Sequence, residues 1–431
     1  MKLVLKGGRI IDPSQQLDIV GDVVVVDGRI EAAGVGLAEA ADGARIIDVS
    51  GLVIAPGLVD MHVHLRDPGL EAKEDIASGT RAAAAGGYTT VCPMPNTKPV
   101  IDNAILVAGM KQKAREEGVV NVQIIGALSK GQQGKELAEI GDMMLNGAVA
   151  LSDDGHYVES AYILKTGLEY ARMFGGLVIS HAEEESLAGD GFMHEGAVSA
   201  MLGLRGRPAV AEDIAVARDV LLAEYTGGTI HIAHVSTAGA VECIRQAKLR
   251  GVKVTAEATP HHLTLTDEAV IGFNTATKVN PPLRSTEHVE ALIAGLKDGT
   301  IDAIATDHAP HAFEEKDMEF RYAPSGFSGL ETALGVILNS FYHTGKFTLN
   351  EVIDRMSTTP AKILGLEAGT LKVGAPADIV VIDPEKEWTI DSNNFYTRGK
   401  CTPYEGNTLR GRAVATIVGG RVVMQGGEVK E

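Results

Sequence analysis

The chain has 431 residues, 45% of them hydrophobic, and a formal net charge of −18 at pH 7. This length fits one large α/β barrel with a smaller domain, and the acidic balance without a basic tract excludes nucleic acid as a partner. No apolar run approaches the ~20 residues of a membrane span, and the first residues lack the apolar region of a signal peptide, so we expect a soluble, cytoplasmic protein with no membrane partner.

Residues 1–55 predict the N-terminal part of a small β-sandwich. Short strand-like runs rich in valine, isoleucine and leucine, such as Lys2 to Leu5 and Asp22 to Val26, are separated by the turn pairs Asp27-Gly28 and Ser50-Gly51. Short strand-like runs joined by such pairs are typical of β-hairpins.

Residues 56–366 show a different pattern, in which strand-like runs are separated by helical segments. The strand-like runs lie near 57–64, 88–92, 121–128, 147–152, 176–181, 229–235, 252–258 and 302–307. This alternation predicts a (β/α)8 TIM barrel. A doubly wound open sheet is the alternative, but no Gly-x-Gly-x-x-Gly or Walker loop follows a strand, and metal-ligand residue types end many strands instead of lining one crevice.

Residues 367–431 return to strand patterns after a helical stretch over about 349–364. Gly369 to Gly374 and Ala377 to Asp383 read as strands, and Ala413 to Val418 and Arg421 to Met424 flank the turn pair Gly419-Gly420. We predict that this segment completes the β-sandwich begun by residues 1–55, so that both termini build one domain beside the barrel.

The first barrel strand ends in two histidines that can share one face. In an extended chain the side chains at i and i+2 point the same way, so His62 and His64 can present two imidazoles together while Val63 packs behind them. A lone His-x-His is as often an ordinary strand as a metal site. Four later strand-like runs also end in metal-ligand residue types, at Asp153-Asp154, His181, His234 and Asp307, which favours a metal centre.

These strand ends and the loops around them resemble the amidohydrolase superfamily and, within it, the dihydroorotases of the smaller bacterial type. The motifs that carry the resemblance are His62-Val63-His64-Leu65-Arg66, Pro93-Met94-Pro95-Asn96-Thr97, Ser152-Asp153-Asp154-Gly155, His181-Ala182-Glu183, His234-Val235-Ser236, Asn280-Pro281-Pro282-Leu283-Arg284 and Thr306-Asp307-His308-Ala309-Pro310-His311. Each motif alone is weak evidence, and their common order along the chain is strong.

The resemblance implies two Zn²⁺ ions per chain, which imidazole and carboxylate ligands suit. His62, His64 and Asp307 would hold one ion, and His181 and His234 would hold the other. Many relatives bridge the ions with a carboxylated lysine, which the fourth strand lacks, so Asp154 is the expected bridge. Asp153 is the alternative, although adjacent residues of an extended strand face opposite sides.

The resemblance also assigns contacts with the substrate to Arg66, Asn96, Asn280, His311, Ser325 and Gly326. Arg66, Asn96 and His311 would bind a carboxylate, Asn280 would read the ring, and the Ser325-Gly326 loop would offer backbone groups. Without the resemblance, Asn96 and Asn280 read as ordinary turn residues because each lies beside a proline.

The function implied is that of a dihydroorotase, which interconverts N-carbamoyl-L-aspartate and L-dihydroorotate in de novo pyrimidine (UMP) biosynthesis, with Asp307 as the catalytic group that transfers the proton. A hydantoinase, dihydropyrimidinase or allantoinase is the alternative of the same fold. An inactive scaffold subunit of aspartate transcarbamoylase is the non-enzymatic alternative. The resemblance leaves open a homodimer and an association with aspartate transcarbamoylase.

Overall fold

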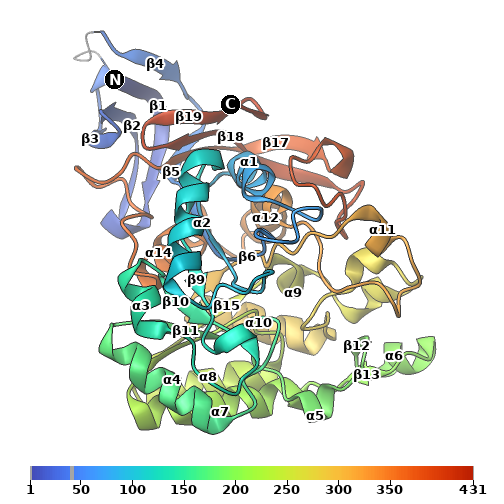
Figure 1. The fold of residues 1–431 in the computed structure, drawn as a ribbon. Coiled ribbons are helices and arrows are strands. Elements are labelled where there is room, and N and C mark those ends of the chain that lie inside the picture. Colours follow the sequence, from blue (N-terminus) through green and yellow to red (C-terminus); the bar gives the residue numbers. More distant parts are fainter. Residues whose placement is uncertain (1, 39–42, 431) are drawn as a thin grey trace.

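The computed structural model describes residues 2–38 and 43–430 and forms a parallel barrel beside a β-rich domain (Figure 1). The barrel strands are β6 (Leu58–Val63), β7 (Tyr88–Pro93), the two short strands β8 (Asn121–Val122) and β9 (Ile125–Gly126), β10 (Ala150–Ser152), β11 (Leu177–Ser180), β14 (Thr229–Ile232), β15 (Val254–Ala258) and β16 (Ala303–Ile304). Neighbouring strands pair in the orders β6-β7-β8 and β9-β10-β11-β14-β15-β16. A parallel bridge between Val63 and His308 joins the first strand to the segment after the last one, which closes the barrel.

Helices surround these strands, and side-chain caps set where several of them begin. The larger ones are α1 (Ile76–Gly86), α2 (Ala104–Glu117), α3 (Ile140–Leu145), α4 (Ala161–Met173), α7 (Val210–Thr226), α8 (Ala238–Leu249), α10 (Thr286–Asp298) and α12 (Leu330–Ile337). Asp75 and Ser78 form a capping box at α1, and the Asn103 side chain accepts from the third residue of α2. Asn103 is therefore the N-cap residue of α2, and the helix itself begins at Ala104.

Shorter elements complete the barrel layer: α5 (Glu185–Ala188), α9 (Pro260–Thr264), α11 (Phe313–Lys316), α13 (Leu349–Ile353) and α14 (Thr359–Ile363). Residues 189–208, here called the excursion, leave the barrel after α5. They carry β12 (Met193–His194), α6 (Ala197–Leu202) and β13 (Gly206–Arg207), with β12 and β13 paired in parallel. Figure 1 shows the excursion reaching outward at the lower right of the barrel.

The β-rich domain is built from both terminal parts of the chain. Its strands are β1 (Lys2–Asp12), β2 (Leu17–Val26), β3 (Arg29–Gly34), β4 (Arg45–Asp48), β5 (Val53–Pro56), β17 (Ile379–Thr389), β18 (Thr408–Val418), β19 (Arg421–Gln425) and β20 (Glu428–Val429). They pair in the order β20-β19-β18-β17-β5-β1-β2-β3, with β4 beside β1. The N-terminal and C-terminal strands therefore meet at the antiparallel β5–β17 ladder.

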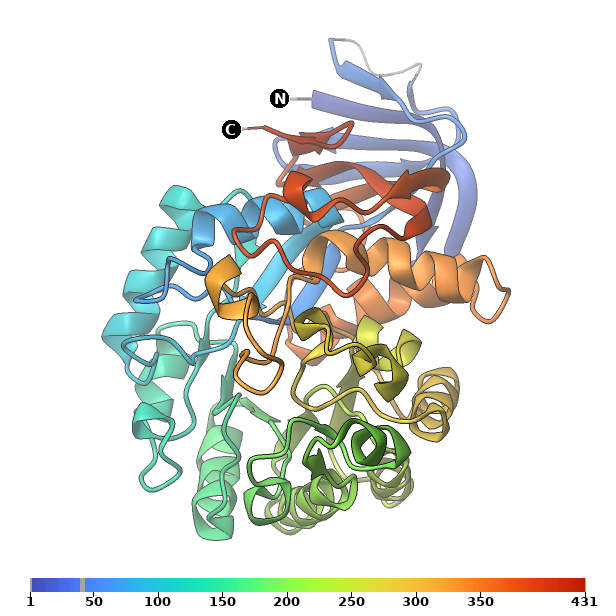
Figure 2. The same ribbon diagram turned by 90° about the vertical axis from the view of Figure 1, so that its right-hand side faces the viewer.

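Strand alternation divides the apolar residues of β17 between two cores. Val380 and Ile382 join the large cluster that also contains the barrel helices, whereas Ile379 and Val381 join the cluster inside the β-rich domain. Figure 2 shows the β-rich domain stacked on one side of the barrel, where β18 contacts α1 and α12. No helix in the described ranges is long and apolar enough to cross a membrane.

The segment Gly369 to Gly374, predicted as a strand, is a loop. Its backbone is held by a side chain, because the Leu371 N–H donates to Asp12 Oδ2 at 2.6 Å, and Thr370 Oγ1 donates to the same oxygen at 3.2 Å. Asp12 is fully buried at the end of β1. This one carboxylate therefore joins the N-terminal part of the domain to the C-terminal part.

We expect Asp12→Ala to destabilise the protein by about 1–3 kcal/mol, because a buried backbone N–H loses its acceptor. Asp18→Ala is the matched control: Asp18 lies on β2, is about half exposed and pairs with Arg9 on the surface, so its loss should cost under about 1 kcal/mol. Urea unfolding followed by circular dichroism measures both. Equal shifts of the unfolding midpoint would contradict this role for Asp12.

Candidate active site

The carboxyl ends of the barrel strands bring the two histidines of the first strand to one carboxylate. His62 Nε2 and His64 Nε2 each lie 3.4 Å from an oxygen of Asp154, which follows β10. Val63, between the histidines, is buried in the hydrophobic core on the other side of the strand. The period of two along β6 therefore aims both imidazoles into the barrel.

A second pair of imidazoles approaches Asp154 from β11 and β14. His181 Nδ1 and His234 Nε2 each lie 3.5 Å from Asp154 Oδ1 and 2.9 Å from one another. Asp154 thus lies between the two histidine pairs, with carboxylate oxygens near all four rings.

Asp307 completes the cluster on the side of the first pair. Its Oδ1 lies 3.1 Å from His64 Nε2 and 3.6 Å from His62 Nε2. Asp307 and His234 have backbone φ angles of 49° and 32°, in the left-handed region that residues other than glycine rarely adopt. Such strained conformations gather at active sites, where the surrounding structure holds them in place.

This donor set fits metal ions. His62 Nε2 and Asp154 Oδ1 are buried without a hydrogen-bond partner in the described part of the chain, although they face each other across 3.4 Å. Buried polar atoms are nearly always satisfied, so two converging unsatisfied ones fit a site for a cation. Burial opposes the charged form of Asp154, but the imidazoles around it outweigh this and hold its pKa well below the ordinary value.

Asp153 takes no part in this cluster. Its carboxylate accepts hydrogen bonds from the backbone N–H groups of Leu128 and Ser129, at 2.9 and 3.0 Å, and from the Ser129 hydroxyl. The two consecutive aspartates therefore face opposite sides, and Asp154 alone of the two lies among the imidazoles.

Glu257, on β15, contacts two of the clustered histidines and was not identified from the sequence. Its Oε1 lies 2.6 Å from His62 Nδ1 and accepts from the backbone N–H of His234 at 3.2 Å. Metal-ligating histidines usually donate their second ring N–H to a carboxylate in this way, which fixes the tautomer. The available signal was an acidic residue inside the otherwise apolar, fully buried end of β15.

A cavity of about 230 Å³ opens beside the cluster. It is lined by His64, Arg66, Asn96, Asp154, Gly155, His181, Arg207, His234, Asn280, Asp307, Ala309, Ser325 and Gly326. The structure thus brings together most of the residues that the sequence singled out. His311 lies directly behind this wall, where its Nε2 donates to the Ser325 carbonyl at 2.8 Å.

The polar groups of the cavity are held in place by further hydrogen bonds. Arg66 Nε donates to the Pro310 carbonyl at 3.2 Å, and Asn96 Oδ1 lies 3.0 Å from His64 Nδ1. Burial and the nearby cations Arg66 and Lys73 lower the pKa of His311 to about 3, so this imidazole is neutral at pH 7. Arg66 is therefore the cation at this end of the cavity.

Comparison with known proteins agrees with this geometry. A family model described as Dihydro-orotase-like matches residues 51–240, and one described as Amidohydrolase family matches residues 327–424. The dihydroorotase of Trichlorobacter lovleyi is 54% identical over 426 residues, which cover 99% of this chain and all of that protein. The dihydroorotase of Citrifermentans bemidjiense is 55% identical over 425 residues, with the same coverage. The chain belongs to the dihydroorotase family.

Solved structures show the fold that this family shares with other cyclic amidohydrolases. The L-hydantoinase (dihydropyrimidinase) from Arthrobacter aurescens superposes with a TM-score of 0.90 at 27% sequence identity, covering all of this chain and 97% of that one. The predicted TIM barrel with a β-rich domain is confirmed, as is the predicted membership of the amidohydrolase superfamily.

Two further buried histidines of the dihydroorotase barrel, His262 and His308, make hydrogen bonds outside the cluster. His308 Nε2 lies 3.3 Å from buried Glu74, and His308 Nδ1 accepts from the Gly329 N–H at 3.1 Å. His262 Nε2 lies 2.9 Å from the Pro281 carbonyl. These imidazoles tie the loops around the site to the barrel wall.

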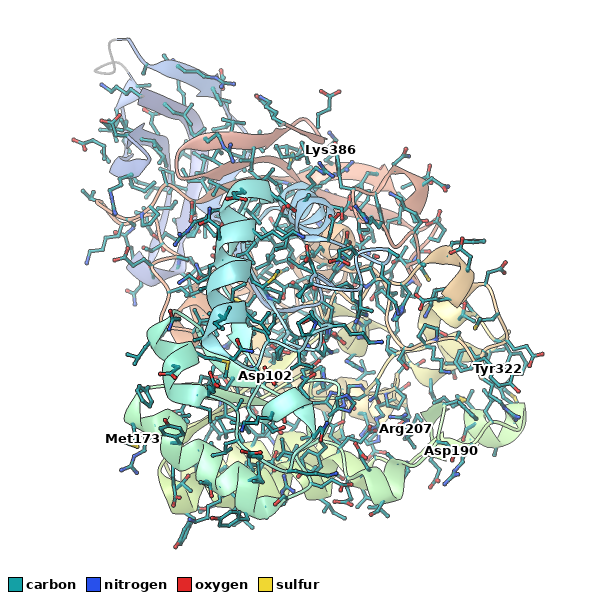
Figure 3. All side chains as sticks on the ribbon, in the orientation of Figure 1. Asp102, Met173, Asp190, Arg207, Tyr322 and Lys386 are labelled. Carbon is teal, nitrogen blue, oxygen red and sulfur yellow. The ribbon has the colours of Figure 1, made fainter. Side chains whose placement is uncertain are left out.

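Arg207 is the second residue of the site that the sequence analysis missed. It lines the cavity and donates from Nη1 to Asn280 Oδ1 at 2.6 Å and to Glu183 Oε2 at 2.7 Å. Figure 3 places Arg207 at the barrel end of the excursion, whereas Asp190 lies farther out. No local pattern marks it, because an arginine in a glycine-rich segment reads as a surface charge.

Metal content distinguishes Asp154 from Asp153. Asp154→Asn removes the negative charge between the four imidazoles, so the variant should retain less metal after dialysis and lose turnover. Asp153→Asn keeps its shape on the opposite face and should retain the wild-type metal content, measured by elemental analysis. If Asp153→Asn lost metal while Asp154→Asn kept it, the assignment of the bridging carboxylate would move to Asp153.

Proposed function

We propose that this chain is an active dihydroorotase, which interconverts N-carbamoyl-L-aspartate and L-dihydroorotate in pyrimidine biosynthesis. The observation that carries the proposal is one cavity whose wall holds five of the six proposed metal ligands beside Arg66, Asn96 and Asn280. The sixth, His62, is buried 3.4 Å from Asp154. The ligand types suit a metal-dependent hydrolase, and the cationic end suits a cyclic amide that carries a carboxylate.

The proposed metal ligands form two groups that share Asp154. His62, His64 and Asp307 would hold one ion, and His181 and His234 would hold the other. We propose zinc, because all of these donors are imidazole nitrogens or carboxylate oxygens. When bound, zinc supplies a water of lowered pKa and polarises the carbonyl that is attacked.

Asp307 is proposed to transfer the proton. Burial opposes its charged form, but His62, His64 and His234 outweigh burial and lower its pKa, so the carboxylate is ionised and able to accept a proton. In the hydrolytic direction Asp307 takes the proton of the attacking water and gives it to the departing ring nitrogen. Synthesis runs the same transfer backwards.

Arg66 is proposed to bind the substrate carboxylate together with Asn96 and with the loop that His311 supports. A planar guanidinium can donate two parallel hydrogen bonds to a carboxylate, which fixes the ring relative to the metal ligands. Neutral His311 holds the Ser325 carbonyl and so shapes the wall beside the ring. The pocket is thereby specific for an acidic ring.

The alternatives are less well supported. A hydantoinase or dihydropyrimidinase shares the fold, but its substrate offers no carboxylate to Arg66. An inactive scaffold subunit would be expected to have lost ligands, whereas the proposed ligands of this chain all face one centre. A homodimer and an assembly with aspartate transcarbamoylase stay predictions of the family resemblance.

Substrate preference tests the proposal. Purified protein supplied with zinc should hydrolyse dihydroorotate with a higher kcat/KM than dihydrouracil, hydantoin or allantoin, and should form dihydroorotate from N-carbamoyl-L-aspartate. Preference for an uncharged ring would indicate a hydantoinase-type enzyme. Bound metal without turnover of any of these compounds would favour the scaffold subunit.

Arg66→Met should selectively weaken the use of dihydroorotate. A hydrogen bond to a charged group is typically worth about 1.5–3 kcal/mol, so kcat/KM should fall roughly 10- to 150-fold. Dihydrouracil lacks the carboxylate, and its slower turnover should change much less. Metal content is checked in both proteins, and equal losses on the two substrates would mean that Arg66 supports the metal site or the fold.

A further inference from the structure

The excursion places the Arg207 side chain at the end of the cavity where Asn280 lies. Arg207 lies on β13, and its Nε donates to the Gly191 carbonyl at 2.7 Å, within the same excursion. Its backbone carbonyl accepts from Nη1 of buried Arg284 at 3.0 Å. Hydrogen bonds at the backbone carbonyl and at Nε thus fix the Arg207 side chain, and its Nη1 end lies at the cavity.

Both hydrogens of Arg207 Nη1 are used at the cavity wall. One is donated to Glu183 Oε2 and the other to Asn280 Oδ1. Glu183 also accepts from Asn280 Nδ2 at 3.2 Å, so the three side chains form a closed triangle. The carboxylate of Glu183 offsets the charge of Arg207, which leaves the guanidinium mainly a directional donor.

This triangle sets the orientation of the Asn280 amide. A guanidinium has donors and no acceptor, so the amide atom that faces Arg207 has to be the carbonyl oxygen. The amide nitrogen is then directed to the side of the metal-ligand cluster, where it lies 3.2 Å from His181 Nε2. Glu183 takes one hydrogen of this nitrogen, and the second points toward His181 at the cavity wall, where a carbonyl oxygen of a bound ring can accept it.

We propose that Arg207 is a positioning residue, which holds Asn280 so that its amide N–H recognises the urea carbonyl of the substrate ring. This inference rests on the proposed function and adds a second group that recognises part of the substrate. Arg66 reads the carboxylate, which dihydroorotate alone carries. Arg207, through Asn280, reads the urea edge, which dihydroorotate and dihydrouracil share.

The two arginines should therefore differ in substrate dependence. Arg207→Met should lower kcat/KM by about 10- to 100-fold on dihydroorotate and by a similar factor on dihydrouracil. Arg207→Lys keeps the charge and the stem but lacks the fork of donors, and it should show the same loss on both substrates. A loss confined to dihydroorotate would overturn the inference, because Arg207 would then bind the carboxylate directly. Full activity of Arg207→Lys would also overturn it.

Arg205→Met is the matched control. Arg205 lies two residues earlier on the excursion, is exposed, and pairs with Asp190 on the surface. Its loss changes the net charge by the same amount and should leave kcat/KM of both substrates unchanged. A loss equal to that of Arg207→Met would assign the effect to net charge or to the excursion as a whole and would overturn the inference.

A double-mutant cycle with Asn280→Ala tests the route of action. If Arg207 acts through Asn280, the double variant should be no slower than Asn280→Ala alone, within about twofold. Multiplying losses would overturn the inference while leaving the proposed function in place. A wild-type protein that turns over neither dihydroorotate nor dihydrouracil would overturn both, so the two failures are distinguishable.

Discussion

The contact between His62 and Glu257 is the interaction on which the site depends. Glu257 Oε1 lies 2.6 Å from His62 Nδ1, so Nε2 is the nitrogen that faces Asp154. The same carboxylate holds the backbone of His234 and lies 3.2 Å from His231 Nε2. One buried carboxylate thereby orients proposed metal ligands from two strands, and the backbone strain at His234 is held where those side chains converge.

Charge distinguishes the two arginines of the cavity. The chain carries a net charge of −18, so its long-range field opposes the approach of an anionic substrate. Within the described part of the chain Arg66 has no ion-pair partner, whereas Glu183 pairs with Arg207. In the proposed function, Arg66 would therefore bind the carboxylate, and Arg207 would act through Asn280 on the ring.

Much of this site follows from strand geometry. His62 and His64 could be predicted because a period of two and the carboxyl ends of barrel strands determine where their side chains point, whereas the choice of Asp154 over Asp153 came from the family resemblance. Glu257 and Arg207 could not, since their roles depend on contacts between segments far apart in the sequence. The loop at Gly369 to Gly374 was wrongly predicted as a strand for the same reason: its backbone partner is the side chain of Asp12, more than 350 residues away.

Metal stoichiometry measured together with turnover tests the central claim most directly. Four imidazoles and two carboxylates that converge on one buried centre should bind two ions per chain. Elemental analysis of the purified protein is predicted to find two zinc ions, chelation to abolish hydrolysis of dihydroorotate, and added zinc to restore it. Full activity in protein from which all metal has been removed would contradict the account.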